Sequence, residues 1–204
     1  MDSLDPHQFY SITGRDSLDK VLAGIDAALS EGIKVKVNVV LMKGFSLARL
    51  QRFLDWIKPL PVTLRFIELM ETGDHHQFYS ANHLTGQPLK NHLLENGWQP
   101  LLRQKDSGPA QEFVHPDFEG RIGLILPYSK DFCQTCNRLR MSATGKLHLC
   151  LFSEHGIDVR PFLQANDVKG LRKTLQEVLL SKHSSHYLHE GMTGATRHLA
   201  MLGG

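Results

Sequence analysis

The sequence has little cysteine, no long apolar run and no glycine-rich phosphate loop. Only three of its 204 residues are cysteine, an odd number that does not suit a disulfide framework. No apolar stretch approaches the roughly 20 residues of a membrane span, and the N-terminal residues do not resemble a signal peptide. The net charge of +2 is too small to argue for nucleic-acid binding. We therefore expect a cytoplasmic globular protein with neither membrane nor nucleic acid as a partner.

The three cysteines all lie in one stretch, as Cys133, Cys136 and Cys150, with the spacing C-x2-C-x13-C. Two thiolates three positions apart can turn inward on one tight loop and bind one metal centre. Thr144-Gly145 predicts a hairpin turn that returns the chain through a strand to the third cysteine. The spacing therefore favours a metal site.

Three thiolates leave one coordination position open. The spacing alone is compatible with a Cys3His zinc site whose fourth ligand is His148 or His155, with an iron–sulfur cluster, or with three buried thiols. Arg138 and Arg140 alternate directly after the first two cysteines, so in an extended segment they point the same way. This indicates a polyanionic ligand beside the metal. The other histidines among the twelve are scattered, and we expect most of them at the surface.

The first third of the chain alternates helical and strand patterns. Residues 2–6 are typical of a strand end running into a turn, Asp16 is a candidate helix cap, and β-branched residues mark the strands. The predicted order is helix 18–29, strand 33–41, helix 47–57 and strand 62–70. This order is typical of parallel βαβ units, whose functional residues lie at the C-terminal ends of the strands.

Polar residues share one face of each predicted strand. Lys36 and Asn38 lie on the same face of the first, and Glu68 and Met70 share a face of the second. The pattern alone favours the plainer alternative, in which Lys36 is a solvated edge residue and Met70 is part of the core.

The remainder is less regular, and we place a domain boundary near residues 71–80. The patterns predict a helix within 84–97, a strand at 120–126, and helices at 159–163 and 168–180. The tail ends in Gly203-Gly204, which can enter a narrow cavity or remain a frayed terminus.

Several motifs together resemble one family. They are Phe132-Cys-x2-Cys-Asn-Arg-Leu-Arg140, Thr144-Gly-Lys-Leu147, Lys36-Val-Asn38, Arg65-Phe-Ile-Glu68 and the final Gly-Gly. The sequence is similar to the GTP 3′,8-cyclases, radical S-adenosylmethionine (SAM) enzymes of molybdenum cofactor biosynthesis. The resemblance implies an α/β fold. Residues 1–71 would be the second half of a partial (β/α) radical-SAM barrel, and residues 72–204 an α+β domain with an auxiliary [4Fe–4S] cluster.

The resemblance also implies a reaction and its residues. The family converts GTP to (8S)-3′,8-cyclo-7,8-dihydroguanosine 5′-triphosphate. Each proposed role comes from a matching position: cluster ligands Cys133, Cys136 and Cys150; GTP-binding residues Lys36, Arg65, Arg138 and Arg140; SAM-binding residues Asn38 and Met70; and Gly203 and Gly204 as a catalytic tail.

One family motif is absent. The C-x3-C-x2-C motif, which binds the SAM-cleaving cluster, does not occur in the sequence. We therefore expect the chain to be the C-terminal part of the enzyme, inactive alone, with a missing N-terminal half or another subunit as partner. A half barrel would leave a strand edge and an apolar face uncovered, so we also expect a homo-oligomer formed through residues 33–70. The alternative is a non-catalytic zinc- or iron–sulfur-binding module.

Overall fold

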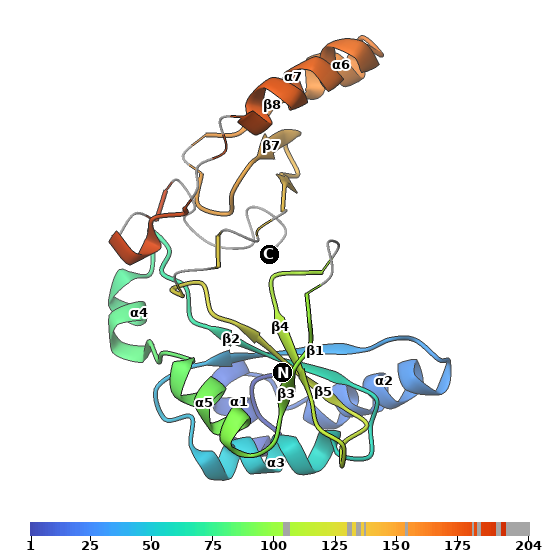
Figure 1. Cartoon of the computed structure of the whole chain (residues 1–204), viewed down its shortest axis with the longest axis vertical. Helices are drawn as coiled ribbons and strands as arrows, with labels where there is room; N and C mark the ends of the chain where they lie inside the picture. The colour runs from blue at the N-terminus through green and yellow to red at the C-terminus, as the bar shows by residue number, and fades with distance from the viewer. Residues whose placement is uncertain are drawn as a thin grey trace. The chain divides into compact units, whose positions relative to one another are not determined.

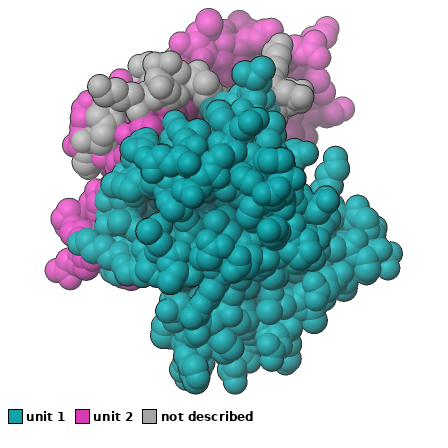
Figure 2. Space-filling view, turned by 60° about the horizontal axis from the view of Figure 1, so that its bottom comes forward, with its two compact units in different colours: residues 1–69, 82–126 teal, residues 70–81, 127–204 magenta. Residues whose placement is uncertain are grey.

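The computed structural model describes residues 1–103, 107–129, 132–133, 136, 138–153, 155–180, 182, 185–190 and 193–194. The chain divides into two compact units (Figure 2). Unit 1 comprises residues 1–69 and 82–126, and unit 2 comprises residues 70–81 and 127–204. None of the described helices is long and apolar enough to cross a membrane.

Unit 1 is built on a mixed five-stranded sheet with the order β1-β2-β5-β4-β3. Strands β1, β2 and β5 run parallel, and β4 and β3 continue the sheet in antiparallel pairing (Figure 1). Its elements are α1 (Pro6–Thr13), α2 (Leu18–Ser30), β1 (Lys36–Leu41), α3 (Leu47–Ile57), β2 (Thr63–Glu68), α5 (Gln87–Glu95), β3 (Gln99–Pro100), β4 (Gln111–Val114) and β5 (Arg121–Ile125).

Local signals set the ends of these helices. Asp5 caps α1 by accepting a hydrogen bond from the Gln8 amide, and Pro6 occupies the first turn, where it needs no amide partner. Gly14 ends the helix at a φ of 65°, a left-handed conformation that suits glycine. Ser46 caps α3 in the same way through the Arg49 amide. Side-chain caps therefore fix the starts of α1 and α3.

The core of unit 1 lies on one face of the sheet. Alternate residues of β1 and β2 are buried there, as the period of two predicts for a sheet covered on one side. Helices α2, α3 and α5 supply the opposing apolar side chains, and these helices lie on one side of the strands in Figure 1. The shared core residues are Ile25, Val37, Val39, Leu41, Leu50, Phe53, Leu54, Ile57, Val62, Leu64, Phe66, Leu93, Trp98, Phe113, Ile122, Leu124 and Leu126.

The opposite face of the sheet carries polar side chains. Lys36, Asn38 and Arg65 alternate with the buried core residues of β1 and β2, and Arg121 begins β5 on the exposed side. We call this the open face. The same face also carries a row of apolar residues, Val40, Ile67 and Ile125, and β1 forms one edge of the sheet. The expected uncovered apolar face and the homo-oligomer stay predictions.

Unit 2 is assembled from short elements around a second sheet, of order β6-β7-β8. Both pairings in that sheet are antiparallel. The elements are α4 (His76–Asn82, whose last residue falls in unit 1), β6 (Arg140–Met141), β7 (Lys146–His148), β8 (Ile157–Asp158), α6 (Arg160–Gln164), α7 (Val168–Leu180) and the 3-10 helix η1 (Leu188–Glu190).

Periodicity located the long elements correctly. The helices expected at 18–29, 47–57 and 168–180, and the hairpin around Thr144-Gly145, are present. Residues 2–5 form no strand, and α1, α4, β3, β4 and β8 were not predicted. Ser17 occupies the N-cap of α2, so the assignment of Asp16 as its cap is wrong.

The compact units also differ from the predicted division at residue 71. Strand β5 pairs with β2, and it brings residues 82–126 into the sheet of unit 1. Mixed α/β architecture is confirmed. The assignment of residues 1–71 and 72–204 to separate functional domains stays a prediction.

Candidate functional site

The open face brings three of the predicted site residues onto neighbouring strands. Asn38 on β1 pairs in register with Arg65 on β2, and the Arg65 Nε donates a hydrogen bond of 2.9 Å to the Asn38 Oδ1. Gly123 on β5 is the next residue in that row. A Cβ atom at Gly123 would lie 2.9 Å from the Arg65 Cγ. Glycine therefore leaves room for the arginine to lie over β5.

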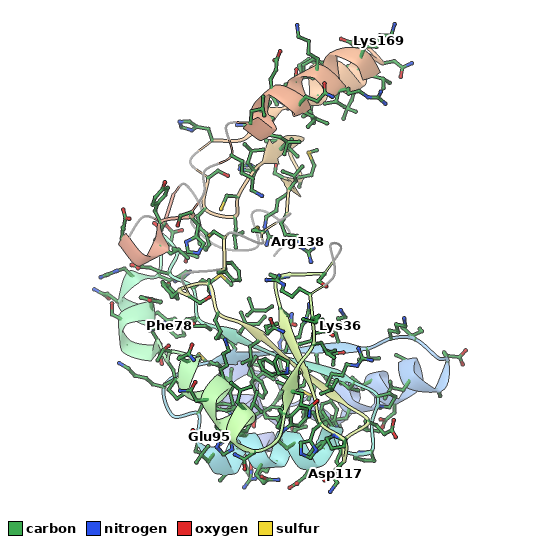
Figure 3. All side chains as sticks on the ribbon, in the orientation of Figure 1. Lys36, Phe78, Glu95, Asp117, Arg138 and Lys169 are labelled. Atoms are coloured by element: carbon green, nitrogen blue, oxygen red, sulfur yellow. The ribbon has the colours of Figure 1, made fainter. Side chains whose placement is uncertain are left out.

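Lys36 and Arg121 converge on one carboxylate. The Lys36 Nζ lies 3.6 Å from the Glu112 Oε1, and the Arg121 Nη1 lies 3.8 Å from the Glu112 Oε2. Figure 3 labels Lys36 on the sheet of unit 1. Strands β2 and β5 lie between β1 and β4, and neighbouring strands are about 4.8 Å apart, so a flat sheet would separate these two backbones by about 14 Å. The contact therefore needs extended side chains that reach across β2 and β5 on the open face.

Glu68 lies on the other side of the sheet, within the core. Its side chain is only 3% exposed, and its Oε1 lies 3.0 Å from the His83 Nε2. Burial raises the pKa of Glu68, and the hydrogen bond from His83 opposes that rise. Glu68 thus ties the end of β2 to the segment before α5. It lies on the opposite face from Arg65.

The two residues predicted to bind SAM, Asn38 and Met70, belong to different compact units. Strand β2 ends at Glu68, and Met70 belongs to unit 2, whereas Asn38 belongs to unit 1. The structure thus does not bring these two residues together within one unit. The strand predicted to reach Met70 stops two residues earlier.

The three cysteines lie in unit 2, half-buried and as free thiols. The Cys136 amide donates to the Cys133 carbonyl at 3.1 Å, which closes the turn between them. The Phe152 amide donates to the Cys150 Sγ at 3.5 Å. The Ser153 hydroxyl accepts from the Cys150 amide and contacts the Cys150 carbonyl. Local hydrogen bonds therefore hold the backbone on both sides of the thiol set.

The thiols also influence one another electrostatically. Burial raises the pKa of the Cys150 thiol, and the nearby thiols of Cys133 and Cys136 raise it further. The Phe152 amide and the Lys182 ammonium oppose these effects. Cys133 and Cys136 therefore lie near enough to Cys150 to affect the ionisation of its thiol.

Two residues near the end of the described chain make hydrogen bonds to the backbone of residues 127–138, which we call the cysteine segment because it carries Cys133 and Cys136. The Lys182 Nζ donates to the carbonyl oxygens of Cys136 and Arg138, at 3.0 and 3.1 Å. The His186 Nε2 lies 2.7 Å from the Pro127 carbonyl oxygen. Sequence reasoning singled out neither residue, because a hydrogen bond to a distant backbone carbonyl leaves no pattern in the sequence.

The predicted phosphate-binding arginines flank the start of β6. Arg138 is exposed and is labelled in Figure 3, and Arg140 begins β6 opposite His148 on β7. Burial lowers the pKa of His148, and its Nδ1 is buried without a hydrogen-bond partner among the described residues. A Cβ at Gly156 would lie 2.5 Å from the His148 Nε2, so glycine accommodates this ring.

The donor chemistry of the thiol group fits a cluster better than a hard cation. Three thiols and an amide that donates to sulfur are features of iron–sulfur and zinc sites. However, in the part of the chain that the structure describes, no three His, Cys, Asp or Glu residues are already arranged to hold a metal ion.

Gly203 and Gly204 lie outside the described residues. Sequence reasoning also did not single out Glu112 or Arg121, because only strand pairing brings these two residues close to Lys36.

A family comparison covers more than half of the chain. Residues 62–188 match the family model described as Molybdenum Cofactor Synthesis C. The matched region contains the three cysteines, Arg138 and Arg140, Lys182 and His186. It also begins one residue before β2, so it crosses the division between the units.

Curated relatives match over the whole chain. A protein named GTP 3′,8-cyclase from Vibrio parahaemolyticus serotype O3:K6 is 52% identical over 206 positions, which cover 100% of this chain and 62% of that protein. Proteins of the same name from Vibrio vulnificus strain CMCP6 and Shewanella denitrificans are 51% and 52% identical. This chain thus spans about 62% of the length of these relatives.

Proposed function

Because the chain belongs to the Molybdenum Cofactor Synthesis C family, we propose that it forms the nucleotide-binding and cluster-bearing part of a GTP 3′,8-cyclase. One observation carries this proposal: three free thiols lie in the same unit as two arginines that come directly after the first two cysteines. A soft metal centre and a polyanion can then bind side by side. The whole enzyme would convert GTP to (8S)-3′,8-cyclo-7,8-dihydroguanosine 5′-triphosphate.

Cys133, Cys136 and Cys150 would hold an auxiliary [4Fe–4S] cluster. When bound by three thiolates, such a cluster supplies one iron with an open coordination position for a nitrogen or oxygen of the nucleotide. The Phe152 amide would stabilise negative charge on the Cys150 sulfur. Residues of this chain would thereby hold the guanine end of the substrate.

The cationic side chains would hold the triphosphate. Arg138 and Arg140 present planar guanidinium groups, which can bind phosphate oxygens through two parallel hydrogen bonds. Lys36 and Arg65 would assist from the open face, and the Asn38 amide oxygen orients the Arg65 guanidinium.

The remaining assignments concern the complete enzyme. Asn38 and Met70 would contact SAM, and Gly203 and Gly204 would act in catalysis. We propose that a missing N-terminal half or another subunit supplies the SAM-cleaving cluster, and that this chain alone is inactive and self-associates. Formation of 5′-deoxyadenosine from SAM by the isolated chain, under anaerobic reducing conditions, would contradict its inactivity.

The first test is anaerobic reconstitution of the chain with iron and sulfide, followed by metal analysis, absorption spectroscopy and titration with GTP. We expect close to four irons per chain and a broad absorption band near about 400 nm that GTP perturbs. A chain that takes up iron but gives no response to GTP would contradict the nucleotide-binding role.

His148 favours a second candidate function, a non-catalytic zinc module. Its buried Nδ1 lacks a partner among the described residues, and a Cys3His zinc site would give that nitrogen one. This function predicts stoichiometric zinc, no colour and no response to GTP. Replacement His148→Phe would then abolish zinc binding, whereas the cluster function predicts that it leaves iron uptake nearly unchanged.

A further inference from the structure

The segment that follows α7 contacts both ends of the segment that carries the first two cysteines. At the far end, the Lys182 Nζ donates to the Cys136 and Arg138 carbonyl oxygens, at 3.0 and 3.1 Å. A hydrogen bond from an ammonium group is roughly twice as strong as one between neutral groups. One side chain therefore fixes the backbone that directs a thiol and the backbone that directs a guanidinium group.

His186 holds the near end of the same segment. Its Nε2 lies 2.7 Å from the Pro127 carbonyl oxygen, and its Nδ1 accepts a hydrogen bond of 3.0 Å from the Leu188 amide. A carbonyl can only accept and an amide N–H can only donate, so the imidazole is neutral with its proton on Nε2. Both ring nitrogens are engaged, and His186 is therefore not a candidate metal ligand.

The His186 ring also packs against two phenylalanines that lie close to cysteines in the sequence. Its centroid lies 5.9 Å from the ring of Phe132, which precedes Cys133, and 5.6 Å from the ring of Phe152. The Phe152 amide is the group that donates to the Cys150 sulfur. Since the His186 side chain is buried, it joins the two cysteine-bearing segments through direct packing.

We propose that Lys182 and His186 are positioning residues, a two-point clamp that prearranges the three thiols and Arg138 for a metal cluster and an anionic ligand. The inference rests on the proposed function, because it takes the thiols as cluster ligands. The clamp acts through backbone carbonyls and aromatic rings, so neither side chain touches the cluster or the substrate. Replacing a group that supports metal ligands in this way typically weakens metal affinity by about 10- to 100-fold.

The test compares Lys182→Met and His186→Phe with the conservative variants Lys182→Arg and His186→Gln, which keep a donor for the carbonyls. Lys173→Met is the matched control, because Lys173 is an exposed lysine of α7 whose 3.9 Å ion pair is with Glu177. Circular dichroism and thermal unfolding establish that each variant is folded. Two readouts follow: iron affinity after reconstitution, and the rate at which a coloured aromatic disulfide reagent modifies the thiols of the metal-free chain.

We expect Lys182→Met and His186→Phe to weaken iron retention about tenfold or more and to accelerate thiol modification severalfold, roughly. Lys182→Arg and His186→Gln should recover most of both properties, and Lys173→Met should match the wild type. Recovery by the conservative variants distinguishes positioning from a general loss of stability. If His186→Phe does not fold, the Lys182 pair alone decides the outcome.

The result separates two failures. Should the wild type take up no cluster while the thiol rates respond to the Lys182 variants, the proposed function fails and the clamp stands. If the wild type takes up a cluster, and Lys182→Met has the same iron affinity and the same rate of thiol modification as the wild type, the clamp is overturned and the proposed function stands.

Discussion

Unit 1 has one large apolar core, whereas the described part of unit 2 combines a few buried apolar side chains, among them Leu147, Phe152, Val159 and Leu188, with polar contacts. In unit 1, one continuous cluster of buried side chains joins three helices to the sheet. In unit 2, α7 has no buried residue over its 13 positions, and the strands of the second sheet are two or three residues long. Its described contacts include the carbonyl bonds of Lys182, the buried His186 and the Asp158–Arg160 ion pair.

This difference indicates which interactions stabilise the fold of each unit. A sheet with one covered face can be stable by burial alone, because the hydrophobic free energy grows with the apolar area removed from water. A small region with short strands gains more from a metal centre, since metal binding adds directly to folding free energy. We therefore expect the loss of a cluster to destabilise unit 2 while unit 1 stays folded.

The largest expected effect on stability is in the core of unit 1. Leu64 on β2 is fully buried, so Leu64→Ala should lower the free energy of unfolding by about 2–5 kcal/mol, through lost transfer energy and the cavity left behind. Urea unfolding measures this change. Leu102→Ala is the matched control, because Leu102 is 96% exposed, and its effect should stay within about 0.5 kcal/mol. Equal effects at the two sites would mean that the core does not stabilise unit 1.

The next effect concerns the thiol set. Cys150→Ser replaces the cysteine whose sulfur accepts the Phe152 amide, and we expect iron retention after reconstitution to fall about tenfold or more. The urea midpoint of unit 1 should not change, because Cys150 belongs to unit 2. Unchanged iron content in the variant would remove Cys150 from the ligand set. A shifted unit 1 midpoint would show that the units are not independently stable.

A smaller effect is expected on the open face. Glu112 is the carboxylate between Lys36 and Arg121, so it competes with any anion for those two cations. Glu112→Gln should tighten binding of inorganic tripolyphosphate on the order of fivefold, which corresponds to about 1 kcal/mol for one unit charge at a partly exposed site. Isothermal titration at low ionic strength measures it.

Two controls accompany the Glu112 experiment. Asp117→Asn removes one carboxylate elsewhere in unit 1, from a residue paired with His115, and should change the affinity much less. Arg121→Met should weaken binding, since it removes one of the two cations. A Glu112→Gln variant with unchanged or weaker affinity would show that Glu112 does not compete with the anion.

The smallest effect is a change in the pH dependence of stability. Burial raises the pKa of Glu68 above its ordinary value of 4.5, so the folded state binds a proton more tightly than the unfolded state. The stability gained from that proton is complete below the unfolded pKa and is lost as pH rises through the folded pKa. Glu68→Gln lacks this dependence. The melting temperature of the wild type should therefore fall relative to that of the variant as pH rises from about 4.

Parallel thermal unfolding curves for the two proteins measure this difference. The amide of glutamine can still bond to His83, so the variant keeps the buried contact. A melting-temperature difference that is constant over the whole range would contradict the raised pKa.

The sequence by itself determined the periodic and local features. Alternation in residues 36–41 fixed which side chains of β1 enter the core, because successive residues of a strand point to opposite faces. The spacing of the three cysteines predicts a metal site, and their motif identified the family that the comparisons then confirmed. Short elements such as β3 and β8 escaped prediction, because two residues carry no periodicity.

Only the tertiary structure decided which residues meet across strands and segments. Asn38 contacts Arg65 because β1 and β2 pair in parallel register, and Glu112 can reach Lys36 because β1 and β4 belong to one sheet. Likewise, Lys182 and His186 look like ordinary polar residues in the sequence. Their contacts with the cysteine segment span 44 to 59 positions, and no local pattern encodes a hydrogen bond to a distant backbone carbonyl. Folding alone creates such pairs, because it brings distant segments into contact.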